Sequence, residues 1–142
     1  MEYYIKDKPQ YKVVARIPKL GRDLDLRVDE VIAMQPDLVL TSLTVPGHER
    51  IVDAIEAAGI RTLVCDPLSL DDIYGDIRRI AAALDIPTRG EQLISEMQAA
   101  MPSRANAKGP KVLIEWWPKP VITPTRLAWA TDLIKLAGGV NP

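Results

Sequence analysis

The sequence predicts an α/β protein in which a parallel sheet is flanked by helices. Two observations predict this class. Short apolar runs that are typical of buried strands alternate with segments of helical periodicity through the first half of the chain. Two long helical patterns then follow each other between residues 69 and 101 without a strand, before a new strand and helix begin. This interruption predicts two α/β units joined by a helical connector.

Length and composition limit the alternatives. The 142 residues, 47% of them hydrophobic, suffice for one compact core but not for two complete lobes of ordinary size. Acidic and basic residues are well mixed and sum to a net charge of −1, which argues against a nucleic acid partner. The sequence contains neither a signal-peptide pattern nor an apolar run that could cross a membrane. An exported parent protein would carry its signal outside this sequence.

The first elements are short. The stretch 11–17 is predicted to be extended, because Pro18 stops an alternating apolar pattern. Asp25 is expected to cap a short helix, which Pro36 terminates. A buried strand over 38–40 follows.

A second helix and strand come next. Pro46 and Gly47 turn the chain into a helix, and Gly59 ends that helix in the left-handed conformation that glycine tolerates. The apolar run 60–65 then predicts another strand.

Two consecutive helices follow this strand. Ser69 and Asp72 have the spacing of a capping box, and apolar residues repeat at helical spacing behind them. Thr88 and Glu91 repeat the box and open a further helix, which Pro102 breaks or kinks.

The last third of the chain predicts the start of a second α/β unit. A strand is expected over 111–117, a proline-rich turn over 118–125, and a helix over 126–137 that a pair of glycines ends.

The residue inventory gives little support for catalysis. His48 is the single histidine, which excludes histidine pairs and multi-histidine metal sites. Phosphate-binding loops, nucleophile elbows and C-x-x-C pairs are missing from the sequence. Cys65 lies in an apolar strand, where a buried and inert thiol is expected. His48 faces either a cleft or solvent, and the helix dipole alone accounts for an acid at Glu49.

The three tryptophans are the sharpest functional signal. Trp116, Trp117 and Trp129 surround the proline-rich turn after the predicted strand, at the sheet edge where α/β proteins bind ligands. Either the rings fill space between sheet and helix, or they offer a flat surface to a large planar ligand. Adjacent strand residues point to opposite faces, so at least one of the neighbouring pair is expected to be exposed. Polar groups would come from Glu115, Thr123, Thr125 and Arg126.

Three phrases of the sequence resemble a known family. They lie at 28–41, which contains Ala-Met-Gln-Pro-Asp-Leu-Val, at 57–64 with its continuation over 69–73, and at 132–139, which ends in Ala-Gly-Gly. In this order and spacing they are similar to the periplasmic substrate-binding proteins of cobalamin, haem and ferric-siderophore ABC importers, the class III type with a helical backbone. The resemblance covers about 28–142.

The resemblance implies two α/β lobes joined by a long helix, with ligand bound between them and no catalysis or cofactor. Residues 1–87 would form part of an N-terminal lobe, 88–105 the connector helix, and 106–142 the start of a C-terminal lobe. Pro102 departs from the continuous helix of the family. Compared with that family the chain lacks segments at both ends, and its parent would be periplasmic or extracytoplasmic and membrane-associated.

The resemblance also implies the binding residues. In the family, ligand contacts come from strand-end loops of both lobes, which here correspond to Ser42, Leu43, Thr44, Val45, Trp116, Trp117 and Pro118, with Arg126 and Trp129 nearby. An acidic residue that docks on arginines of the permease corresponds to Glu49.

Several alternatives remain at this stage. The tryptophans favour cobalamin as the ligand, whereas Arg126 keeps an iron chelate open, and a single histidine disfavours the zinc and manganese binders of the superfamily. An enzyme or metallocluster subunit would need more cysteine ligands than Cys65. A signalling or interaction domain would predict one continuous sheet, which the strandless stretch opposes. An open sheet edge would favour a homodimer or segment exchange.

Overall fold

The computed structural model describes residues 18–21, 25–43, 45–104 and 108–142. The extended stretch predicted over 11–17 lies outside these residues. Four elements form the first α/β unit, which we call the first unit: α2 (Val28–Ala33), β1 (Val39–Ser42), α3 (Glu49–Ala57) and β2 (Thr62–Cys65).

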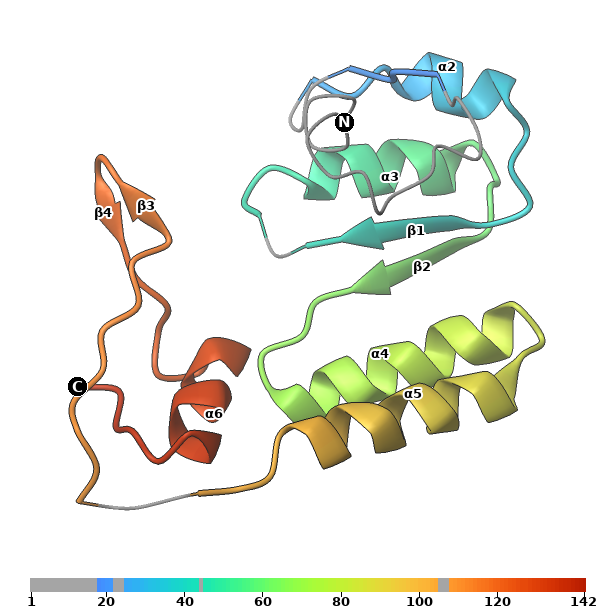
Figure 1. Cartoon of the computed structure of the whole chain (residues 1–142). Helices are drawn as coiled ribbons and strands as arrows, with labels where there is room; N and C mark the ends of the chain where they lie inside the picture. Colours follow the sequence, from blue (N-terminus) through green and yellow to red (C-terminus); the bar gives the residue numbers. More distant parts are fainter. Residues whose placement is uncertain (1–17, 22–24, 44, 105–107) are drawn as a thin grey trace, which may run out of the picture.

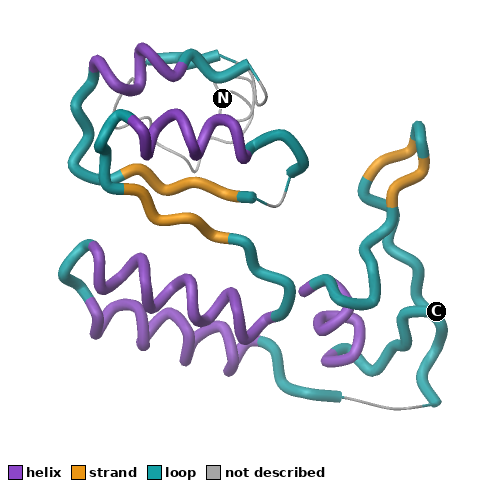
Figure 2. Tube along the Cα trace, turned by 180° about the vertical axis from the view of Figure 1, so that it is seen from behind, coloured by secondary structure: helices purple, strands orange, loops and turns teal. Residues whose placement is uncertain are grey.

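Strands β1 and β2 run parallel, in a register that places Val39 opposite Thr62 and Ser42 opposite Cys65. Helix α3 is the crossover between them, as a parallel pair requires. Figures 1 and 2 show the strand pair between helices α2 and α3 on one side and helices α4 and α5 on the other. The predicted class, a parallel sheet flanked by helices, is confirmed.

The start of α2 differs from the prediction. The residue at its N-cap is Arg27 and not Asp25, and the Arg27 side chain makes no capping hydrogen bond. Gly21 and Leu26 form an isolated antiparallel bridge, and the Arg27 N–H donates to the carbonyl of Leu20 at 2.7 Å. Asp25 therefore belongs to the turn inside this bridge, too early to cap the helix. At the end of α3, Gly59 has a φ of +77° as predicted.

Helices α4 (Leu70–Ala83) and α5 (Pro87–Ala100) form an antiparallel hairpin. The predicted capping box is confirmed, because the Asp72 N–H donates to Ser69 Oγ at 3.1 Å and the Ser69 N–H donates to Asp72 Oδ2 at 2.9 Å. The second predicted box is wrong. Helix α5 begins at Pro87, a favoured first helical residue, so Thr88 already lies inside the helix.

The α4–α5 hairpin carries a hydrophobic core cluster. Leu70, Tyr74 and Ile94 are buried at its centre, and further apolar side chains pack around them, namely Ile73, Ile77, Met97, Leu133 and Leu136. Leu133 and Leu136 come from the C-terminal part of the chain, residues 108–142, which we call the second unit. One core therefore spans the α4–α5 hairpin and the second unit. On the other side, Arg79 Nη2 donates to the carbonyl of Val64 in β2 at 2.7 Å.

The second unit (residues 108–142) contains β3 (Trp117–Pro118), β4 (Val121–Ile122) and α6 (Trp129–Leu136). The strand predicted over 111–117 is wrong in extent. Lys111 makes an isolated parallel bridge with Val140, and β3 pairs with β4 in an antiparallel hairpin. Among the described residues no longer strand lies beside 112–116, so an apolar pattern alone does not form a ladder there.

The described strands thus form two separate sheets, β1–β2 and β3–β4, and not the continuous sheet expected of a single doubly wound domain. The helix predicted over 126–137 starts later, at Trp129, and Gly138 with a φ of +86° follows its end. The helix predicted over 88–105 ends at Ala100, before Pro102. None of the described helices is long and apolar enough to cross a membrane.

Candidate functional site

The carboxyl edge of the β1–β2 sheet defines the candidate site. In both views the ends of these strands point to the side of the molecule on which the β3–β4 hairpin and α6 lie. Ser42 and Cys65 are the last strand residues, and the loops that follow them sit at this edge. Parallel α/β sheets bind ligands at the carboxyl ends of their strands.

The loop after β1 is held by backbone contacts. The Leu43 N–H donates to the carbonyl of Cys65 at 3.1 Å, and the His48 N–H donates to the carbonyl of Val45 at 3.3 Å. Ser42, Leu43 and Val45 are all half-buried. Thr44 lies outside the described residues.

His48 is not a solvated side chain. It is half-buried at the N-cap of α3, and its Nδ1 lies 3.0 Å from the carbonyl oxygen of Ser42. Because a carbonyl oxygen only accepts, Nδ1 must carry the proton in this contact. His48 also lines a hollow of about 380 Å³ between β1 and helices α2 and α3.

Glu49 is the first residue of α3 and is exposed. Its Oε2 accepts the Gly47 N–H at 2.7 Å. Hydrogen bonds from backbone N–H groups, its own first and that of Gly47 second, lower the pKa of this carboxyl. Glu49 is therefore a charged and exposed group at neutral pH, fixed in direction at the start of a helix.

Cys65 ends β2 and is half-buried. Burial, followed by the charge of Asp76, raises the pKa of its thiol. The thiol is protonated at neutral pH, which agrees with the inert role expected of it.

On the second unit, two of the three tryptophans meet. The ring centroids of Trp116 and Trp129 lie 6.3 Å apart with planes inclined by 32°. Trp116 is 48% exposed, so it is not a core residue, and Trp129 is half-buried. The backbone N–H of Trp116 donates to the carbonyl of Ile122 at 2.8 Å, which fixes the main chain of Trp116 beside the β3–β4 hairpin. Trp117 and the exposed Pro118 form β3.

The surroundings of the tryptophan pair are apolar and open. Val121 is 63% and Leu127 75% exposed, and Ile122 and Leu113 are exposed as well. Arg126 is exposed between the hairpin and α6, as are Glu115, Thr123 and Thr125. This surface offers exposed apolar area, and the exposed cations Lys119 and Arg126 lie in the same stretch of sequence.

The segment before α6 is fixed by a polar chain. Asn141 Nδ2 donates to Thr131 Oγ1 at 2.6 Å, and Thr131 Oγ1 donates to the carbonyl of Thr125 at 2.9 Å. Thr131 is buried, so these hydrogen bonds satisfy a hydroxyl that would otherwise be costly to bury. They hold the approach to Trp129 in place.

The structure thus brings the predicted residues together in two groups. Ser42, Leu43 and Val45 lie with Glu49 on the first unit, and Trp116 lies with Trp129 on the second. Among the described residues there is no cluster of three or more histidine, cysteine or acidic side chains that could hold a metal ion.

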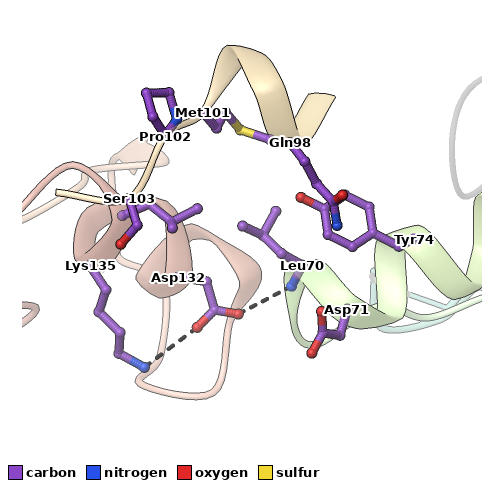
Figure 3. Close-up of a pocket in the computed structure, with 10 residues that line it drawn as sticks. Leu70, Asp71, Tyr74, Gln98, Met101, Pro102, Ser103, Asp132 and Lys135 are labelled. Atoms are coloured by element: carbon purple, nitrogen blue, oxygen red, sulfur yellow. Dashed lines mark hydrogen bonds and ion pairs between the residues drawn. The ribbon is translucent and has the colours of Figure 1, made fainter. Parts of the chain in front are cut away.

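Sequence reasoning missed Asp132. Its side chain lines a hollow of about 470 Å³ between the start of α4, the end of α5 and α6 (Figure 3). Its Oδ2 accepts the Leu70 N–H at 3.1 Å, and its Oδ1 lies 3.4 Å from Lys135 Nζ. The sequence shows only an acid in the first turn of a helix, which the helix dipole explains locally.

Comparisons with known proteins agree on one family. The sequence profile described as periplasmic binding protein matches residues 2–142. The vitamin B12-binding protein of Salmonella choleraesuis strain SC-B67 is 24% identical over 120 residues, which cover 82% of this chain and 45% of that protein.

Solved structures extend the comparison. An ABC transporter substrate-binding protein of Listeria monocytogenes EGD-e superimposes with a TM-score of 0.69 at 23% identity, over 92% of this chain and 54% of that one. A periplasmic haem-binding protein of Roseiflexus sp. RS-1 in its apo form gives a TM-score of 0.65 at 28% identity, over 88% of this chain and 50% of that one. The chain spans about half the length of the proteins it matches.

Proposed function

The chain belongs to the periplasmic binding protein family, and on this premise we propose that it acts in the substrate-binding component of a bacterial ABC importer. The ligand is cobalamin or a related iron chelate, haem or a ferric siderophore. It binds between the two α/β units and is passed to the permease without chemical change. Relatives named for vitamin B12 and for haem support this ligand range.

The observation that carries the proposal is the tryptophan pair, of which Trp116 is exposed and Trp129 half-buried. Trp116 and Trp129 offer neighbouring indole faces on the side of the molecule toward which the β1–β2 sheet directs its strand ends. Large aromatic surfaces bind planar ligands such as corrin and porphyrin rings through apolar burial and stacking. Trp117, Pro118 and Arg126 complete the contacts of the second unit, with Arg126 available to anionic groups of an iron chelate.

The first unit supplies the opposite side of the site. We assign ligand contacts to the loop Ser42, Leu43, Thr44 and Val45, and permease docking to Glu49. The exposed and ionised carboxylate of Glu49 suits an arginine of the permease, because the backbone N–H of Gly47 already orients it. We also propose the lobe division expected from the sequence, with residues 1–87 as part of an N-terminal lobe, 88–105 as the connector, most of which α5 covers, and 106–142 as the start of a C-terminal lobe.

The parent protein works outside the cytoplasm, attached to the membrane. A second copy of the chain is expected to pair along the β1–β2 sheet, since both of its strands are edge strands among the described residues. Light scattering across a wide concentration range tests this, and a constant monomer mass would refute it.

Ligand titration tests the main proposal. Cyanocobalamin, haemin and a ferric siderophore are each added to the chain while tryptophan fluorescence is followed, with correction for ligand absorbance. We expect saturable quenching by one of the three. Trp116→Ala should weaken binding about tenfold, roughly 1.4 kcal/mol, whereas the control Leu84→Ala, at the exposed tip of the helical hairpin, should not. No saturable response to any of the three would overturn the proposal.

A further inference from the structure

One carboxylate links the second unit to the helical hairpin by a contact between residues that are far apart in the sequence. Leu70 is the first residue of α4, and its N–H is one of the four at a helix start that lack a partner within the helix. The Ser69 hydroxyl satisfies the N–H of Asp72 but not that of Leu70. Asp132 of α6, 62 positions further on, accepts the Leu70 N–H (Figure 3).

Two helix dipoles favour a negative charge at the position of Asp132. The carboxylate lies at the positive end of the α4 dipole and, within the first turn of α6, near the positive end of its own helix. Lys135 at 3.4 Å balances part of its charge. The side chain of Asp132 is 32% exposed, so it is partly shielded from competing water.

Among the described residues, the rest of the junction includes apolar packing and one backbone hydrogen bond. Leu133 and Leu136 join the hairpin core through apolar contacts, which permit sliding. Leu136 lines two hollows. One, of about 470 Å³, is also lined by Asp132, and the other, of about 500 Å³, is also lined by Arg104 and Ala137. The Arg104 N–H, which donates to the Leu136 carbonyl, is on the segment that leads into the second unit.

The contact between Asp132 and Leu70 joins segments that are close in sequence to the two halves of the proposed site. Asp132 lies three residues after Trp129 in α6. Its partner Leu70 is the first residue of α4, which follows the loop after β2. A change in the contact between Asp132 and Leu70 would therefore move the tryptophan pair relative to the carboxyl edge of the β1–β2 sheet.

We propose that Asp132 is a positioning residue that caps α4 from the second unit. It thereby sets the angle between the second unit and the body formed by the α4–α5 hairpin and the first unit, which Arg79 ties to β2. The inference rests on the proposed function in so far as this angle sets the width of the ligand site. A fixed angle lowers the entropy that is lost when ligand orders the site.

The test measures the geometry without ligand. Spin labels are attached through Asp53→Cys on α3 and Val121→Cys on β4, both at exposed positions, in a Cys65→Ser background. Asp132→Ala should broaden the distance distribution between the labels and speed hydrogen exchange at the Leu70 amide about tenfold. Asp132→Asn retains an acceptor oxygen and should restore both readouts, and Lys135→Ala, which leaves the Asp132 contact intact, should change neither.

Circular dichroism confirms that each variant is folded, and Asp132→Ser, whose oxygen is too short to reach Leu70, replaces Asp132→Ala if the latter does not fold. Unchanged distances and unchanged Leu70 exchange in the alanine or serine variant would overturn the inference. Since neither readout uses ligand, such a failure is distinguishable from failure of the fluorescence titration, which tests the proposed function itself.

Discussion

The indole rings of Trp116 and Trp129 lie 6.3 Å apart, inclined by 32°, although one precedes the β3–β4 hairpin and the other begins α6. Rings at this distance couple electronically and contribute about 0.5–1.5 kcal/mol beyond their buried area. Trp116→Ala should therefore remove part of the near-ultraviolet circular dichroism and cost about 1 kcal/mol of unfolding free energy. Urea denaturation measures the cost. If the spectrum of Trp116→Ala equals the wild-type spectrum minus that of one isolated tryptophan, the contact between the rings is contradicted.

Two helical glycines give a matched test of the α4–α5 packing. A Cβ at Gly90 would lie 2.6 Å from Ala81 Cβ, whereas a Cβ at Gly75 meets nothing within 4 Å. Gly90→Ala should destabilise the protein by about 1–3 kcal/mol through overpacking. Gly75→Ala should stabilise it by about 0.5–1 kcal/mol, because alanine favours the helix. Thermal and urea unfolding of the two variants must move in opposite directions if the hairpin packs as described.

The capping box of α4 should make stability depend on pH. Hydrogen bonds from the Ser69 hydroxyl and the Leu68 N–H lower the pKa of Asp72 in the folded chain. Its contribution is therefore present above the ordinary aspartate pKa of about 4 and is lost as the pH falls through the lowered value. The melting temperature of Asp72→Asn should lie below that of the wild type at pH 7, and this difference should vanish under strongly acidic conditions.

Two further variants control this prediction. Ser69→Ala should cost about 1 kcal/mol at neutral pH, the usual value of an N-cap. Asp71→Asn, on the same helical turn but outside the box, should lower the melting temperature at pH 7 less than Asp72→Asn does. Equal losses at pH 7 for the two asparagine variants would show that the box does not carry the contribution.

The docking role proposed for Glu49 predicts that ligand binding and transport can be separated. Glu49→Gln should leave ligand affinity unchanged and reduce ligand uptake in vesicles that contain the permease, because it removes charge without changing size. Glu56→Gln, near the far end of the same helix and also exposed, is the matched control. Equal uptake with both variants would exclude Glu49 as a docking residue.

The periodic elements of the first unit and the hairpin could be predicted because local chemistry specifies them. Ser69 and Asp72 cap a helix with atoms only three residues apart, and Gly59 ends α3 by its own conformational freedom. The errors came where a partner outside the segment decides the structure. The stretch 112–116 has an apolar pattern but, among the described residues, only single backbone hydrogen bonds at its two ends to Val140 and Ile122. Asp25 lies in the turn of the bridge between Gly21 and Leu26, before the helix begins.

The candidate site was predictable to a similar extent. The tryptophans stood out by their clustering around one turn, and the structure brings Trp116 and Trp129 into contact. Asp132 gave no comparable signal, because its partner is the backbone N–H of Leu70 and carries no side-chain signature in the sequence. The surroundings of His48 stayed open for a related reason, since a main-chain oxygen of Ser42 holds its ring.

The antiparallel course of α4 and α5 means that the chain enters and leaves the hairpin at the same end, next to the second unit (Figure 1). The opposite end, where Leu84 and Ile86 are exposed on either side of Asp85, is remote from both groups of candidate site residues. This tip can therefore accept an inserted reporter domain or a surface-attachment tag, while the loops proposed to contact the ligand stay unobstructed for use as a sensor.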